Sequence, residues 1–77
     1  MYNCMTLFID SYIENEFEGW DDDKVFKLGN GTKWELASYR YSYKYAYRPK
    51  AKVWRSGGTY YLEVEGMNEK VHVNQLY

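Results

Sequence analysis

The chain has one histidine and one cysteine, the residue types that most often act as a general base or a nucleophile. His72 alternates with Val71 and Val73, so on a strand its side chain lies opposite to theirs and faces solvent. Cys4 stands beside Met5, where a thiol usually serves as a small buried hydrophobe. No nucleophile–base pair is recognisable, and we expect a protein that is not an enzyme, with no catalytic residue and no cofactor.

Two further patterns could bind ions. The three aspartates at 21–23 offer carboxylate oxygens to a divalent cation, but they lack the spacing of a calcium loop and are typical of a solvated turn. Lys44, Gly57 and Gly58 make no phosphate-binding loop, because no glycine-rich turn opens a helix. The sequence therefore predicts neither a metal site nor a phosphate loop.

Residues 39–47 carry the most regular pattern, Tyr-Arg-Tyr-Ser-Tyr-Lys-Tyr-Ala-Tyr. Tyrosine at every second position has the side-chain period of a β-strand, so the five rings of this tyrosine ladder lie on one face. Exposed tyrosines in a row combine apolar rings with polar tips, a composition enriched at protein interfaces. We expect self-association into a dimer or tetramer through an interface of Tyr41, Tyr43, Tyr45 and Tyr47.

Basic residues around the ladder support a second interpretation. Residues 24–55 hold nine basic residues against one acidic residue, whereas residues 10–23 hold seven acidic residues and no basic one. Together with tyrosines, a basic surface would suit a small barrel that binds single-stranded nucleic acid, where stacking contributes about 1–3 kcal/mol per base. The candidate anion-binding residues are Arg40, Lys44, Arg48, Lys50, Lys52 and Arg55.

Two observations weaken the nucleic-acid interpretation. Cations and tyrosines that alternate on a strand lie on opposite faces, and a formal net charge of −1 is unlike that of dedicated nucleic-acid binders, which are usually basic. The charge blocks have a simpler explanation if acidic and basic strands pair across a sheet, for a few tenths of a kcal/mol per pair. We therefore favour a self-associating interaction module, or a protein partner, over nucleic acid.

The elements that must position these residues are short strands joined by tight turns. Gly29-Asn30-Gly31, Ser56-Gly57-Gly58 and residues 66–69 are turn signals, and Pro49 breaks the strand before it. Sequential hairpins without a long helix predict an all-β fold, an antiparallel barrel of five to six strands (residues 11–77) after a short N-terminal helix or arm (residues 1–10). Strands are expected over 11–17, 24–28, 32–47 (as one strand, or two joined at a bend), 50–55, 59–65 and 70–74.

The alternation of side chains in residues 32–47 does not fit a single regular strand. The large apolar residues up to Leu36 occupy even positions, whereas the tyrosines that follow occupy odd ones, and direction cannot switch within a regular strand. Either a β-bulge near Ala37-Ser38 turns the tyrosines inward, or the strand continues in phase and the ladder faces outward. A small core can hardly supply partners for five hydroxyls, so we expect Tyr39, with or without Tyr41, to pack against the core while the later tyrosines project.

The expected core contains the large apolar residues of the strand faces turned inward, with Trp20 folded over one end of the barrel. Its members are Phe17, Phe26, Leu28, Trp34, Leu36, Val53, Leu62, Val64 and Val71.

Much of the chain, roughly residues 11–76, resembles a group of small bacterial proteins of unknown function. The matching stretches are Phe17-Glu18-Gly19-Trp20, Val25-Phe26-Lys27-Leu28, Asn30-Gly31, Trp34, residues 39–49 and residues 61–66. The ladder ending in Tyr47-Arg48-Pro49 is the most specific of them. These proteins occur alone or as terminal modules, some in mobile gene cassettes. The resemblance implies a small SH3-like barrel and carries over no functional residue.

Composition also bears on the compartment. A single cysteine cannot form an internal disulfide, which is typical of a reducing environment. No apolar run approaches the roughly 20 residues of a membrane helix, and no basic region precedes an apolar stretch as in a signal peptide. We expect a cytoplasmic protein with no membrane partner.

Overall fold

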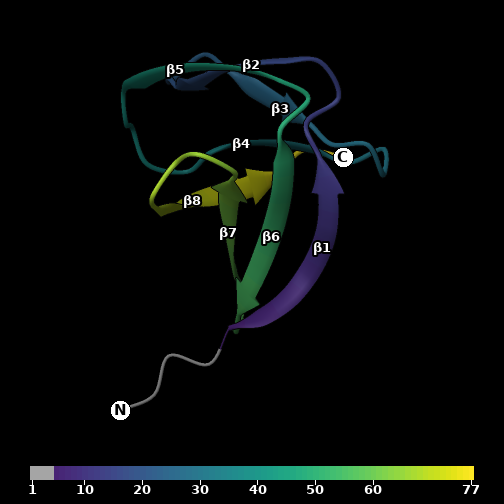
Figure 1. Ribbon diagram of the computed structural model, residues 1–77. Coiled ribbons are helices and arrows are strands. Elements are labelled where there is room, and N and C mark those ends of the chain that lie inside the picture. Colours follow the sequence, from purple (N-terminus) through teal and green to yellow (C-terminus); the bar gives the residue numbers. More distant parts are fainter. Residues whose placement is uncertain (1–4) are drawn as a thin grey trace.

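The computed structural model describes residues 5–77, which form eight β-strands and no helix. Six strands build one sheet in the order β1-β6-β7-β8-β4-β3, and β2 and β5 form a separate two-stranded ribbon (Figure 1). All pairings are antiparallel, which confirms the all-β antiparallel fold. The strands are β1 (Thr6–Tyr12), β2 (Glu16–Trp20), β3 (Val25–Lys27), β4 (Lys33–Leu36), β5 (Ser42–Tyr47), β6 (Lys50–Ser56), β7 (Thr59–Val64) and β8 (Lys70–Gln75).

The six-stranded sheet curls without closing. Its two edge strands, β1 and β3, approach each other only at one end, where Ile13 and Leu28 form a single bridge. Beside this bridge the amide of Glu14 donates to the carbonyl of Lys27 at 2.8 Å. No ladder joins β2 to β3 in the described part of the chain. The structure thus shows two open sheets that touch, and a closed SH3-like barrel is not shown.

A shared bend connects the two sheets. The pairing of β1 with β6 continues into the pairing of β2 with β5 through two bonds: Ile13 N–H donates to the Pro49 carbonyl, and Arg48 N–H to the Asn15 carbonyl, both at 2.9 Å. The expected break at Pro49 is confirmed. Of the two alternatives for residues 32–47, the structure shows two strands, β4 and β5, because the chain leaves the sheet after Leu36 and enters the ribbon at Ser42.

The phase conflict is resolved by an outward ladder. Trp34 and Leu36 on β4 and Ala46 on β5 pack in or against the core, whereas the odd-numbered tyrosines face water. The alternative of a bulge near Ala37-Ser38 that turns the tyrosines inward is not found, because residues 37–41 belong to no strand. The expected packing of Tyr39 against the core is wrong, since Tyr39 is 69% exposed. In water the phenol hydroxyls find the hydrogen-bond partners that a small core could hardly supply. The direction of the alternating side chains changes instead at Arg48, whose φ of +50° lies in the left-handed region.

The core lies between the curled sheet and the ribbon. Of the nine expected core residues, all are buried except Leu36, which is half-buried against them. Trp20 is also buried, beneath the ribbon, with its ring centroid 5.4 Å from that of Phe17 and 5.5 Å from that of Phe26. These edge-on aromatic contacts fix the ribbon over one end of the sheet. Ile9, Ile13, Ala51 and Val73 complete the buried set.

Residues 6–12 form a strand rather than a helix. β1 pairs along β6 from Thr6 opposite Arg55 to Tyr12 opposite Lys50. Ile9 is buried opposite Val53, and this burial selects the extended conformation over a helix. The domain boundary expected at residue 10 falls inside β1. The interpretation of Cys4 as a buried hydrophobe lies outside the described residues.

Candidate interaction surface

A glycine allows β5 to lie close to β2. Gly19 has a φ of +99°, and a Cβ placed on it would stand 1.9 Å from the carbonyl oxygen of Ser42. The register between the strands shifts at this point, where Gly19 lies opposite Tyr43. Only glycine combines this backbone conformation with so close an approach of another backbone. Gly19 therefore sets the position of the strand that carries the tyrosines.

All five ladder tyrosines are exposed, from 51% for Tyr45 to 69% for Tyr39. On the ribbon, Tyr43, Tyr45 and Tyr47 share the outer face with the exposed carboxylates of Glu16 and Glu18 on β2. These five residues are called the tyrosine face below. Tyr39 and Tyr41 extend it along the loop that leads into β5.

Two polar contacts organise the tyrosine face. The Tyr45 hydroxyl donates to Glu16 Oε2 at 3.4 Å, and partial desolvation, followed by the nearby Glu16 charge, raises the pKa of Tyr45. Lys24 Nζ lies 2.8 Å from Glu18 Oε1, and this hydrogen bond raises the pKa of Lys24. The charge of Glu18 is thus compensated within the chain. Glu16 forms no ion pair with any of residues 5–77.

The candidate anion-binding residues do not gather on the tyrosine face. Arg40 pairs with Glu69, and Lys44 Nζ donates to the carbonyl of Gly66 at 3.2 Å. The Arg48 guanidinium lies 4.9 Å from the centre of the Tyr12 ring. Arg55 donates to the carbonyl of Gly57 at 2.9 Å. Four of the six candidates are thus held by separate partners.

The remaining two candidates, Lys50 and Lys52, border two hollows on the outer face of the six-stranded sheet. One hollow has a volume of about 250 Å³, and Glu63, Glu65 and Met67 line it beside the two lysines. The other, of about 550 Å³, lies over β1 beside Asp10 and Tyr12. Lys50 and Lys52, with Glu63, Glu65 and Met67 beside them, are called the lysine face below.

Charge alternates across the strands beside the lysine face. Asp10, Lys52, Glu63 and Lys70 are successive cross-strand neighbours on β1, β6, β7 and β8. Lys70 Nζ lies 3.9 Å from Glu63 Oε2. This is the side-by-side arrangement of acidic and basic strands that the charge blocks of the sequence favour.

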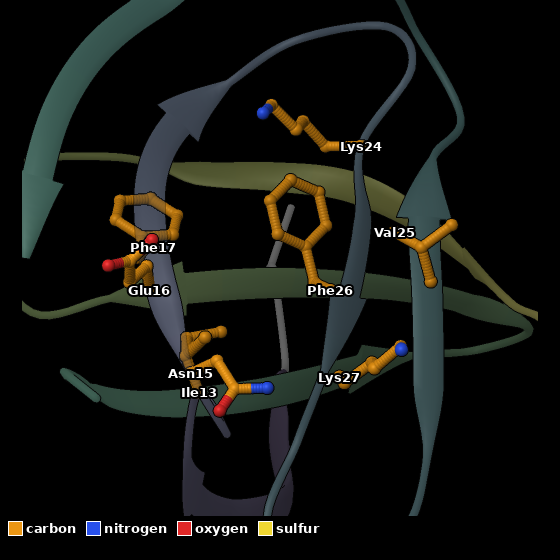
Figure 2. Close-up of a pocket in the computed structure, with 8 residues that line it drawn as sticks. All are labelled: Ile13, Asn15, Glu16, Phe17, Lys24, Val25, Phe26 and Lys27. Atoms are coloured by element: carbon orange, nitrogen blue, oxygen red, sulfur yellow. The ribbon is translucent and has the colours of Figure 1, made fainter. Parts of the chain in front are cut away.

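A cavity between β2 and β3 was not expected from the sequence. It has a volume of about 210 Å³, and Figure 2 shows the Phe17 and Phe26 side chains on its two sides, with Lys24 and Lys27 toward opposite ends. The expected strands 11–17 and 24–28 could not reveal it, because the gap depends on β2 turning away from β3 after the bridge at Ile13. The remaining lining residues are Ile13, Asn15, Glu16 and Val25.

The residues considered first for chemistry are dispersed. His72 is exposed on β8, as predicted, and its ring stacks on Tyr61 with 5.7 Å between centroids. The aspartates form the turn after β2, where Asp22 N–H donates to Asp21 Oδ1 at 2.7 Å. Within residues 5–77 no three histidine, cysteine, aspartate or glutamate side chains converge as metal ligands. The same residues include no helix of the length and apolarity needed to cross a membrane.

Comparison with known proteins adds no further constraint. The chain matches no protein-family model, no curated protein and no solved structure. Its function has to be inferred from its own surface, on which the ladder supplies five of the exposed aromatic side chains of residues 5–77.

Proposed function

We propose that this protein is a non-catalytic interaction module that self-associates through the tyrosine face into a dimer or tetramer. The observation that carries the proposal is the exposure of five ladder tyrosines, each more than half accessible. At roughly 150–250 Å² per ring, reduced by exposed fractions of 51–69%, the five side chains offer about 500–800 Å². A standard interface buries about 800 Å² per partner, so the ladder and its neighbours would supply most of one.

The ribbon that carries the rings is already fixed in place. Its inner face packs on the core through Phe17, Trp20 and Ala46. Tyrosine has few rotatable bonds, so a partner would order these side chains at a small entropic cost. A rigid and aromatic surface of this kind favours protein recognition.

Single-stranded nucleic acid is the second candidate, and it rests on Lys50 and Lys52, which border the two hollows. We rank it lower because Glu16, which has no ion pair within residues 5–77, would repel phosphates from the rings that bases would stack on. Arg40 and Arg55, which the nucleic-acid interpretation also needs, already have partners within the chain.

Three finer statements belong to the same proposal. An open variant of the SH3-like small barrel is supported by the bridge that brings the two sheet edges together. Kinship with small bacterial proteins, some of them from mobile gene cassettes, is supported by the ladder ending in Tyr47-Arg48-Pro49. A cytoplasmic location is supported by the single cysteine of the chain.

The test is the mass of the protein in solution from low to high micromolar concentration, measured by light scattering. We expect the mass to rise above that of the 9.3 kDa chain and to return to it in the double variant Tyr43→Ser, Tyr45→Ser. Tyr77→Ser is the matched control, because Tyr77 is 77% exposed but lies outside the ladder. A wild-type protein that stays monomeric throughout this range would contradict the proposal.

A further inference from the structure

The strand β5 has a free edge. It pairs with β2 on one side, and among residues 5–77 no other strand pairs with it. None of the backbone hydrogen bonds outside the strand ladders of the described chain involves β5. The other edge of the ribbon is enclosed: Glu14 N–H donates to the Lys27 carbonyl before β2 begins, and Lys24 N–H donates across the turn that follows β2. The described part of the ribbon is therefore open to a further strand along β5.

Backbone groups of β5 point out from this free edge. Arg48 N–H donates to the carbonyl just before β2 at 2.9 Å, so the Tyr47 carbonyl, in the same trans peptide, points away from β2. The Ser42 carbonyl points at Gly19, since its oxygen would lie 1.9 Å and its carbon 2.9 Å from a Cβ placed there. Tyr43 N–H shares the peptide of that carbonyl and therefore points away from β2 as well. A donor and an acceptor, near the two ends of β5, are thus free for another strand.

The strand β5 is complementary to itself when two copies run antiparallel with Tyr45 opposite Tyr45. In this register Tyr43 of each copy lies opposite Tyr47 of the other, so the free N–H meets the free carbonyl on both sides of the two-fold axis. Tyrosines directly opposite each other stabilise antiparallel strands. Lys44 lies opposite Ala46, so no like charges face each other across the new edge.

The same arrangement keeps carboxylates apart. Glu16 has no ion pair within residues 5–77 and lies on β2, away from the free edge of β5. With the two β5 strands joined, the two Glu16 side chains are at least three strand spacings apart, about 14 Å. Two tyrosine faces packed on each other would instead bring these carboxylates together, which is unfavourable. Lys44, the charged side chain of β5, is held at the Gly66 carbonyl at 3.2 Å.

We propose that two copies of this chain join along β5 and form one four-stranded ribbon in the order β2-β5-β5-β2. This inference rests on the proposed self-association and names the contact through which it occurs. The same edge of both copies meets, so the contact is isologous and closes with two copies. A dimer follows rather than a tetramer, in which backbone hydrogen bonds provide affinity and the paired tyrosines fix the register.

Proline and serine at position 43 distinguish strand pairing from simple packing of rings. Tyr43→Pro and Tyr43→Ser both remove the ring, but only proline also removes the N–H that points away from β2. Proline is tolerated on an edge strand where the N–H faces solvent. We expect Tyr43→Pro to self-associate at least about tenfold more weakly than Tyr43→Ser, because the dimer loses two hydrogen bonds. Light scattering from low to high micromolar concentration measures this difference, and circular dichroism verifies that both variants fold.

Cysteine cross-linking tests the register and does not depend on the proline variant. Tyr43→Cys and Tyr47→Cys are prepared in a Cys4→Ser background and mixed with oxidised glutathione. Opposite residues of antiparallel strands are close enough for a disulfide, whereas the two copies of position 43 are about 13 Å apart in this register. We expect the mixture to form a cross-linked dimer at least about tenfold faster than either variant alone. Tyr77→Cys mixed with Tyr47→Cys is the matched control and should remain slow, because Tyr77 is exposed but lies outside the ladder.

The outcomes separate the two proposals. A wild-type protein that stays monomeric rejects self-association, and this inference with it. If the wild type associates but Tyr43→Pro does so as tightly as Tyr43→Ser, the tyrosine faces meet without pairing of β5, and only this inference is rejected. The same conclusion follows if Tyr43→Cys cross-links to itself as fast as to Tyr47→Cys.

Discussion

Replacement of Gly19 by alanine should strongly destabilise the fold, because it separates the two strands of the ribbon. Real Cβ atoms essentially never approach another heavy atom within 3.0 Å, yet a Cβ at Gly19 would lie 1.9 Å from the Ser42 carbonyl oxygen and 2.9 Å from the Lys44 nitrogen. Both are backbone atoms of the β5 region and cannot rotate away. The strand β5 must therefore move outward by more than about 1 Å, taking its tyrosines with it.

The loss of stability in Gly19→Ala has two parts. Holding an L-residue at positive φ costs roughly 1–2 kcal/mol. Hydrogen bonds lost between β2 and β5 add about 0.5–1.5 kcal/mol each, and the loosened cover over Trp20 adds to this. We expect Gly19→Ala to lower the free energy of unfolding by about 3–5 kcal/mol. A domain of this size has a total stability of roughly 4–12 kcal/mol, so the loss would reach about half of it.

Urea unfolding followed by tryptophan fluorescence is a suitable assay, because Trp20 and Trp34 are both buried. Gly57→Ala is the matched control. Gly57 also has positive φ, +61°, but its added Cβ would meet nothing within 4 Å. The control should lose only about 1 kcal/mol. The difference between the two variants isolates the contact with β5, and a difference below about 1 kcal/mol would refute the reasoning.

Three further predictions concern single contacts. Thr32→Val should lower the free energy of unfolding in urea by about 1–3 kcal/mol, because the indole nitrogen of buried Trp34 donates to the Thr32 hydroxyl at 2.9 Å and would lose its partner. Thr32→Ser keeps the hydroxyl and should lose much less stability. Arg48→Ala should lower the free energy of unfolding by about 0.5–1 kcal/mol, because the cation over the Tyr12 ring is lost. Arg48→Gly should lose less, since glycine adopts the positive φ of this position without strain, and equal losses in the two variants would show that the backbone is not strained there. In an NMR titration that resolves each tyrosine, Tyr45 should deprotonate above its ordinary pKa, and Glu16→Gln should lower that pKa; an unchanged pKa in the variant would exclude the Glu16 contact as a cause. Because the folded chain holds this proton more tightly than the unfolded chain, the stability contributed by Tyr45 should fall as the pH rises through about 10.

Local patterns were sufficient for the parts of the fold that depend on neighbouring residues. Alternation placed Leu62, Val64 and Val71 in the core, and the glycine pair at 57–58 marked a hairpin turn, because both depend on residues close in sequence. The tyrosines were recognised as one ladder for the same reason. Their outward direction was one of two alternatives, which only the position of the chain after Leu36 could decide.

Long-range pairing was beyond the sequence. Met5, Leu7 and Ile9 alternate, but helical spacing was also present, and only the pairing of residues 6–12 with 50–55 distinguishes the two. The partner of Tyr45 was missed for a similar reason, since Glu16 comes beside it only through the shifted register at Gly19. The hollows of the lysine face are built by residues from β1, β6 and β7 together, so no local signal could have revealed them.

The pairing of β1 with β6 also has a consequence for synthesis. β1 leaves the ribosome before the other seven strands, but its partner strand β6 is translated only after β2 to β5. Until then Leu7, Phe8 and Ile9 have no neighbouring strand and expose apolar surface in the nascent chain. Stable structure should therefore appear only when most of the polypeptide has emerged from the exit tunnel, and a chain arrested before residue 50 should remain sensitive to protease.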